Sequence, residues 1–176
     1  MRAVADLAKI QAFMAALGAA AKAPGRIYLT GGATALLLGW RTSTVDVDLK
    51  GDPEPQGMFE AIAQLKDTLD VNIELASPDQ FIPALPGWRE RSQFIAAHGQ
   101  VEFFHYDLYS QTLAKLQRGH ERDFTDARAM LARGLVEPRR IRDLFAAIEP
   151  ALIRFPGIDP VEFRVVVDQF CQSHSA

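Results

Sequence analysis

The sequence has little cysteine, with Cys171 the single thiol among 176 residues. One cysteine forms no intramolecular disulfide and builds no cysteine-based zinc site, which favours a reducing compartment, and we expect the cytoplasm. The chain also lacks an excess of basic charge, because it contains 19 Lys and Arg residues and 22 Asp and Glu residues. This balance excludes a general electrostatic affinity for polynucleotides, so any nucleic-acid partner must meet a local patch.

Long apolar runs are missing as well. The longest candidate, at 35–38, falls far short of the roughly 18 apolar residues of a membrane span, and we expect no membrane partner. The N-terminal segment is rich in small residues, but Asp6, Lys9 and Gln11 interrupt it, so we interpret it as an amphipathic helix rather than a secretion signal. The apolar fraction of 48% and the charged fraction of 23% are typical of a folded globular chain.

Hydrophobic periodicity predicts that strands and helices intermix early and that helices alone follow. We expect strands over 26–30, 44–49, 70–75, 92–97 and 100–106, and helices over 4–17, 33–40, 57–69, 108–119, 123–132, 138–148 and 160–171. The Pro-rich segment 77–89 is expected to be a loop packed in part on the body. The predicted class is α/β, of the α+β kind: a mixed sheet packed by helices, with a helical C-terminal part. We assign 1–106 to the core and 107–176 to helices packed on it, together one compact unit.

The strand over 44–49 carries an acidic face. Its residues alternate strictly, so Asp46 and Asp48 share one side while Val47 faces the other. Side chains two apart on a strand are about 6.6 Å apart at the backbone, which lets both carboxylates reach one pocket. Two such charges repel unless a cation or hydrogen-bond donors lie between them, and a hard divalent ion suits oxygen ligands.

A third carboxylate comes from the next predicted strand, where Glu74 occupies a polar position of the same alternation. Neighbouring strands lie about 4.8 Å apart, so Glu74 can join Asp46 and Asp48. Three acids suffice for two metal ions, Mg²⁺ or Mn²⁺, in phosphoryl or nucleotidyl transfer. The alternative for an acid-x-acid pattern alone is a solvated outer strand face.

The glycine pair upstream favours the functional interpretation. Gly31 and Gly32 follow the strand over 26–30 and precede a predicted helix. Backbone N–H groups at such a turn suit phosphate oxygens, and paired glycines allow close approach.

Two runs together, LTGGATAL at 29–36 and RTSTVDVDL at 41–49, resemble the polymerase-beta-type nucleotidyltransferase superfamily. Within it, the chain is most similar to the AbiEii-like toxin group and to related uncharacterised bacterial nucleotidyltransferases of the DUF6036-like kind. The resemblance implies that the glycine turn handles the nucleotide triphosphate and that the acidic strand holds the metals. These roles fall on Gly31, Gly32, Asp46 and Asp48.

The resemblance also implies a third acid on a later strand. Glu74 is the best positional match, and Asp107, after the second hairpin strand, is the fallback. Ala33 stands where the group often has threonine, so a hydroxyl contact to phosphate would come from Thr34.

A downstream run, LAKLQRGHERDFTD at 113–126, is similar to a helical signature of the AbiEii-like group. By that resemblance Lys115 contacts the triphosphate. Lys115 and Arg118 are three residues apart on one helical face and can neutralise phosphate, while Asp123 and Asp126 can hold the basic side chains in place. The alternative is a salt-bridged helical surface.

These observations predict a metal-dependent nucleotidyltransferase that moves a nucleoside monophosphate from an NTP to an acceptor hydroxyl. By resemblance, the acceptor is RNA, such as tRNA, or a protein, and the chain is the toxin that a cognate antitoxin protein would oppose. Two alternatives stay open: a catalytically silent domain of the same fold that binds nucleotide or a partner, and transfer to a small molecule such as an antibiotic.

Overall fold

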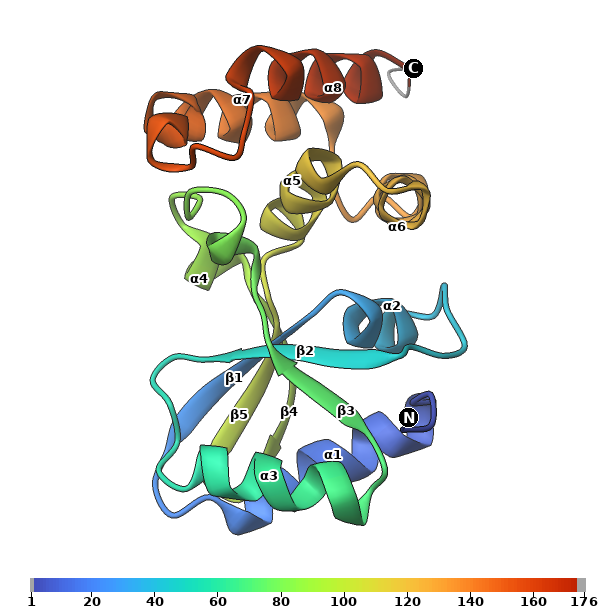
Figure 1. Cartoon of the computed structure of the whole chain (residues 1–176), viewed down its shortest axis with the longest axis vertical. Coiled ribbons are helices and arrows are strands. Elements are labelled where there is room, and N and C mark those ends of the chain that lie inside the picture. The colour runs from blue at the N-terminus through green and yellow to red at the C-terminus, as the bar shows by residue number, and fades with distance from the viewer. Residues whose placement is uncertain (1, 174–176) are drawn as a thin grey trace. The chain divides into compact units, whose positions relative to one another are not determined.

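The computed structural model describes residues 2–173, and within them the chain forms a five-stranded mixed sheet and eight α-helices (Figure 1). The predicted mixed sheet with a helical C-terminal part is confirmed. Two compact units can be distinguished. The sheet unit comprises the chain up to Ser77 together with Ser92–Tyr106, and the helical unit comprises Pro78–Arg91 and the chain from Asp107 onward.

The sheet unit contains three helices and all five strands. In chain order these are α1 (Leu7–Ala20), β1 (Gly25–Thr30), α2 (Gly32–Leu38), β2 (Asp46–Gly51), α3 (Met58–Thr68), β3 (Asn72–Leu75), β4 (Gln93–His98) and β5 (Val101–His105). The strand order is β3-β2-β1-β5-β4. Strand β1 runs antiparallel to β2 and parallel to β5, β2 is parallel to β3, and β4 is antiparallel to β5.

One face of this sheet forms the core. Figure 1 shows α1 and α3 side by side along that face. The core combines buried apolar side chains of these helices and of the strands: Ile10, Phe13, Leu17, Ile27, Leu29, Val47, Leu49, Ile62, Ile73 and Phe103. Because side chains alternate along a strand, burying Val47 and Leu49 turns Asp46 and Asp48 to the opposite face.

The two acidic strands begin later than predicted. Val45, which the alternation predicted for 44–49 would place on the same side as Val47, is 54% exposed, because Thr44 pairs with Ala5 in an isolated antiparallel bridge and β2 begins only after it. Asp70 has a positive φ of 49°, which strands do not adopt, so β3 begins at Asn72.

The helical unit contains five α-helices and two 3₁₀ segments. These are Pro78–Gln80 (3₁₀), α4 (Trp88–Arg91), α5 (Leu108–Arg118), α6 (Glu121–Ala132), α7 (Pro138–Ile148), Glu149–Arg154 (3₁₀) and α8 (Pro160–Ser173). Helix α5 packs against α6, α7 and α8. The Pro-rich segment is anchored by buried Ile82, Leu85 and Trp88, and it is more regular than predicted because it includes the first 3₁₀ turn and α4.

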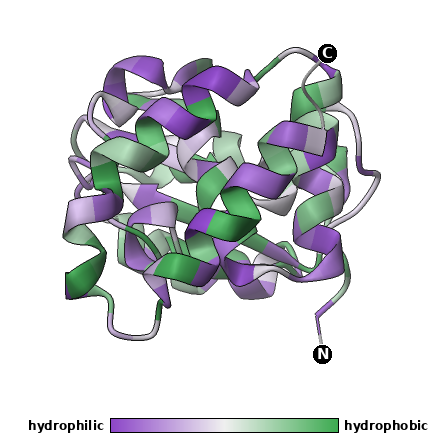
Figure 2. Ribbon diagram, turned by 90° about the horizontal axis from the view of Figure 1, so that it is seen from above, coloured by the Kyte–Doolittle hydropathy of each residue, from purple (hydrophilic) through white to green (hydrophobic). Residues whose placement is uncertain are grey.

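Helix α8 begins where it was predicted to begin, at Pro160. Asp159 caps α8, since its Oδ1 accepts hydrogen bonds from the backbone N–H of Val161 at 3.0 Å and of Glu162 at 3.2 Å. Figure 2 shows hydrophobic and hydrophilic residues alternating along the helices, as expected where one side of a helix is buried. No helix in the described part of the chain is long and apolar enough to cross a membrane.

Candidate functional site

The glycine turn connects β1 to α2, and both glycines are required there. Gly31 has a φ of +64°, which side-chain-bearing residues rarely adopt. A Cβ atom at Gly32 would clash with the hydroxyl of Thr44. Helix α2 ends at Leu38, earlier than predicted, because Gly39 adopts a left-handed conformation with φ +98°. With only seven residues, α2 contributes little dipole at the turn.

The acidic strand reaches this turn. Thr30, the last residue of β1, pairs with Asp48 on β2. A Cβ atom built on Gly31 would lie 3.1 Å from Asp48 Oδ2. The carboxylate of Asp48 therefore lies directly against the glycine turn, and two of the predicted site elements are adjacent.

The parallel pairing of β2 with β3 determines where the other two acids, Asp46 and Glu74, lie. Asp46 lies opposite Asn72, and Asp48 lies opposite Glu74. The Asn72 amide donates a short hydrogen bond to Asp46 Oδ1 and a second one, of 3.4 Å, to Glu74 Oε1. Asn72 thus bridges two of the predicted site carboxylates. Asn72 had no predicted role, although the alternation of 70–75 places it on the same face as Glu74.

Oxygen donors of this kind suit a hard divalent cation. Asp46 and Asp48 are half-buried on one face of β2, while the side chain of Glu74 is exposed. Among residues 2–173, no three His, Cys, Asp or Glu side chains gather closely enough to hold a metal ion. Strand β2 supplies two carboxylates, and β3 supplies a third in register with Asp48.

Thr34, predicted as a phosphate contact, is fully buried. Its hydroxyl donates to the carbonyl of Leu29 at 3.3 Å and lies 3.0 Å from His105 Nδ1. His105 is also buried, and this burial lowers its pKa to about 4, so the imidazole is neutral near pH 7. These contacts join α2 to β1 and β5, and they assign the Thr34 hydroxyl to the interior rather than to a ligand.

Asp107, the fallback third acid, belongs to the helical unit. Its carboxylate caps α5 by accepting from the backbone N–H groups of Tyr109 at 3.2 Å and Ser110 at 3.3 Å. Arg91 also binds it through both oxygens, at 3.0 and 2.8 Å. These bonds occupy the carboxylate, which favours Glu74 as the third acid.

The basic and acidic residues of the downstream run form one cluster within the helical unit, the α5–α6 ion cluster: Lys115, Arg118, Asp123 and Asp126. Lys115 Nζ lies 2.8 Å from Asp126 Oδ2 and 3.8 Å from Asp123 Oδ1. Arg118 binds Asp123 through two nitrogens, at 2.9 and 3.2 Å. Both aspartates are 1% exposed. The predicted contacts between the basic side chains and the aspartates are present; the aspartates and Lys115 are largely buried, whereas Arg118 is exposed.

A family model described as "Nucleotidyltransferase of unknown function (DUF6036)" matches residues 5–153. The matched range contains all five strands, the glycine turn and the α5–α6 ion cluster. No curated protein matches the chain significantly, and no solved structure does so. The family description supports a general nucleotidyltransferase role for the geometry found here.

Proposed function

This chain belongs to the DUF6036 family of nucleotidyltransferases, and from that membership we propose that it transfers a nucleoside monophosphate from an NTP to an acceptor hydroxyl. The acceptor oxygen would form a bond to the α-phosphorus, the bond from that phosphorus to the pyrophosphate oxygen would break, and pyrophosphate would leave. The observation that carries the proposal is the contact between the Asp48 carboxylate and the Gly31 turn, because it joins a candidate metal ligand to a candidate phosphate site.

Asp46, Asp48 and Glu74 are the proposed ligands of Mg²⁺ or Mn²⁺. When bound, such ions would offset the negative charge of the triphosphate and orient the reacting oxygens. Asn72, hydrogen-bonded to Asp46 and Glu74, would hold these carboxylates in place before a cation arrives. Gly31 and Gly32 would admit the triphosphate to the turn.

The resemblance of the run 113–126 to the AbiEii-like signature supports a phosphate-binding role for the two basic side chains of the α5–α6 ion cluster. Lys115 and Arg118 would contact phosphate oxygens, and Asp123 would orient Arg118 through its paired hydrogen bonds. The side chain of Arg118 is 46% exposed, so Arg118 can keep its ion pair with Asp123 and still donate hydrogen bonds to a phosphate.

For the acceptor, we propose RNA, such as tRNA, or a protein, with the chain acting as a toxin that a cognate antitoxin protein neutralises. This part of the proposal depends on the resemblance of its motifs to the AbiEii-like group. The overall charge of −3 is compatible with an acceptor that meets a local surface only.

The test is incubation with each α-labelled NTP, Mg²⁺, and cellular RNA or a lysate, alongside Asp46→Asn. We expect label to move to one class of acceptor with wild type and not with the variant. Equal transfer by Asp46→Asn would exclude the proposed site. A panel of small hydroxyl compounds, including antibiotics, examines transfer to a low-molecular-weight acceptor.

A second candidate is a silent domain that binds nucleotide without turnover. It is favoured by the absence of a three-residue metal cluster among residues 2–173 and by the internal hydrogen bonds of Thr34. Binding of NTP with Mg²⁺, without pyrophosphate release on any acceptor, would favour this candidate over the transferase.

A further inference from the structure

The sheet face that carries the acidic strand also carries a set of aromatic side chains. Three rings that are paired in register form this set, the aromatic row: Tyr28 of β1, Phe104 of β5 and Phe94 of β4. Directly paired residues point to the same face of a sheet. Tyr28 lies two residues before Thr30, which pairs with Asp48, so the row and the Asp48 carboxylate share the face opposite α1 and α3.

The rings of the aromatic row pack against one another. Tyr28 and Phe104 are stacked, with ring centroids 5.4 Å apart, and Phe94 meets Phe104 edge-on at 5.7 Å. The guanidinium of Arg26 lies 5.4 Å from the centroid of Phe104 and also pairs with Glu102 at 3.5 Å. All of these residues belong to the sheet unit, so this surface is defined by that unit alone.

Exposure increases along the row toward the edge of the sheet. Tyr28 is buried, Phe104 is half-buried, and Phe94, on the edge strand β4, is 58% exposed. An exposed ring that continues a set of packed rings, with polar side chains beside it, is typical of a binding surface. The row therefore offers aromatic surface to a partner.

The chemistry of this surface suits unpaired nucleobases. Every base has a flat face that stacks on phenylalanine or tyrosine, and arginine adds cation–π and phosphate contacts. Arg26 contacts the row, and Lys50 pairs with Tyr28, so two cationic side chains accompany the rings.

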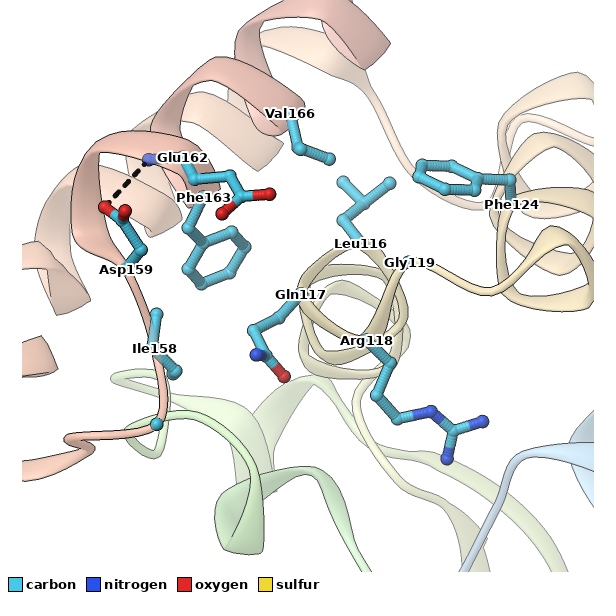
Figure 3. A pocket seen from close by; sticks show the side chains of 11 residues that line it. Leu116, Gln117, Arg118, Gly119, Phe124, Ile158, Asp159, Glu162, Phe163 and Val166 are labelled. Carbon is cyan, nitrogen blue, oxygen red and sulfur yellow. Dashed lines mark hydrogen bonds between the residues drawn. The ribbon is translucent and has the colours of Figure 1, made fainter.

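The shape of the surface favours an extended strand over a small molecule. The pocket of about 340 Å³ drawn in Figure 3 is formed by α5, α6 and α8 of the helical unit and shares no residue with the aromatic row. A concave pocket of that kind suits a small ligand, whereas rings presented along the face of a sheet suit successive bases of a single strand.

We propose that the aromatic row docks an unpaired segment of an RNA acceptor, whose bases stack on Phe94 and Phe104. The proposal rests on the proposed nucleotidyltransferase function, for which it favours RNA over protein and names the residues that hold the acceptor. Neighbouring strands are about 4.8 Å apart and alternate residues about 6.6 Å, so the backbones of Phe104 and Asp48 lie about 12 Å apart. A few nucleotides cover this span, which brings an acceptor hydroxyl within reach of Asp46 and Asp48.

The test is fluorescence anisotropy of a labelled single-stranded RNA of mixed sequence, titrated with the full chain in Mg²⁺ at constant salt. Phe94→Leu keeps an apolar side chain but removes the ring, and it should weaken binding at least about tenfold. Phe94→Trp restores a stacking surface and should bind within about twofold of wild type. Phe59→Leu is the matched control, because Phe59 is 51% exposed on α3, outside the row, and it should leave the affinity unchanged.

A second variant tests the cationic part of the surface. Arg26→Gln changes an exposed side chain, and it should weaken RNA binding and make the affinity less dependent on salt, because one phosphate contact is lost. Urea unfolding of every variant verifies that it is folded.

Three results would overturn the proposal: unchanged RNA binding by Phe94→Leu, a duplex bound as tightly as the single strand, or transfer of label to protein alone. Asp48→Asn separates this proposal from the transferase proposal, since it should lose transfer and keep the binding that depends on Phe94. Such binding without transfer to any acceptor supports the surface and excludes turnover. Transfer to RNA at the wild-type rate by Phe94→Leu supports turnover and excludes the surface.

Discussion

The acidic face of the sheet and the α5–α6 ion cluster are built from similar residues but satisfy their charges differently. In the cluster, Asp123 and Asp126 are buried and paired with Lys115 and Arg118 at 2.8 to 3.8 Å. On the sheet, the carboxylate of Asp46 accepts a hydrogen bond from the neutral side-chain amide of Asn72. Removing one partner of a buried ion pair leaves an unpaired charge in the interior, whereas neighbouring carboxylates that accept from a neutral amide keep oxygens suited to a cation from solution. The comparison predicts opposite outcomes for the same Asp→Asn change in the two regions.

The largest effect is expected on the sheet. Asp48→Asn should lower nucleotidyl transfer by about a thousandfold or more, because the variant loses a proposed metal ligand beside the glycine turn, while the midpoint of urea unfolding should change little. Transfer rates and unfolding curves of the same preparation measure both. Loss of stability together with activity would mean that Asp48 serves the fold and would remove the contrast between the regions.

The reverse is expected in the cluster. Asp126→Asn removes the nearest carboxylate of Lys115, whose side chain is 11% exposed, and should lower the free energy of unfolding by about 3–5 kcal/mol. The matched control is Asp168→Asn, which breaks the exposed ion pair with Arg142 and should cost less than about 1 kcal/mol. Equal, small costs in both variants would show that the cluster contributes nothing to folding.

Features that depend on a few neighbouring residues were predicted well from the sequence. Alternation along 44–49 predicts that Asp46 and Asp48 share a face, and it holds because Val47 and Leu49 must both be buried. The start of α8 was similarly predictable, since Asp159 and Pro160 act within one turn. In these cases the signal lies in the same few residues that form the structure.

Other features depend on residues far apart in the chain. The exposure of Val45 follows from the bridge between Thr44 and Ala5, which the alternation within 44–49 does not predict. Thr34 faces the interior because His105, 71 residues later, lies beside it. Asn72 lies opposite Asp46 because of the register of β3 against β2, and the pattern of one strand does not specify that register.

His105 sharpens the comparison, because it is a buried titratable group of the sheet unit that is kept neutral. Its pKa is lowered to about 4 by burial, from 6.5. The unfolded chain therefore binds the proton more tightly, so this contribution to stability is complete above about pH 6.5 and is lost as the pH falls toward 4. The loss should be roughly 2–3 kcal/mol, measured by urea unfolding between pH 4 and 7.5.

His105→Gln should flatten that pH dependence, since glutamine does not titrate and can still hydrogen-bond to Thr34. His120→Gln, at an exposed position, should leave it unchanged. An unaltered pH profile in His105→Gln would assign the acid sensitivity to other groups.

The smallest effect concerns the glycine turn, where backbone strain can be separated from contact with the acid. Gly31→Ala and Gly134→Ala both place a Cβ on a residue with positive φ, +64° and +70°, and each should cost about 1–2 kcal/mol of stability. Only at Gly31 does the added atom meet a carboxylate, 3.1 Å from Asp48 Oδ2, whereas at Gly134 it meets nothing within 4 Å. The two variants should therefore lose similar stability in urea unfolding, but only Gly31→Ala should weaken NTP binding in calorimetry. Equal nucleotide affinity in both would mean that the turn positions Asp48 without approaching the phosphates.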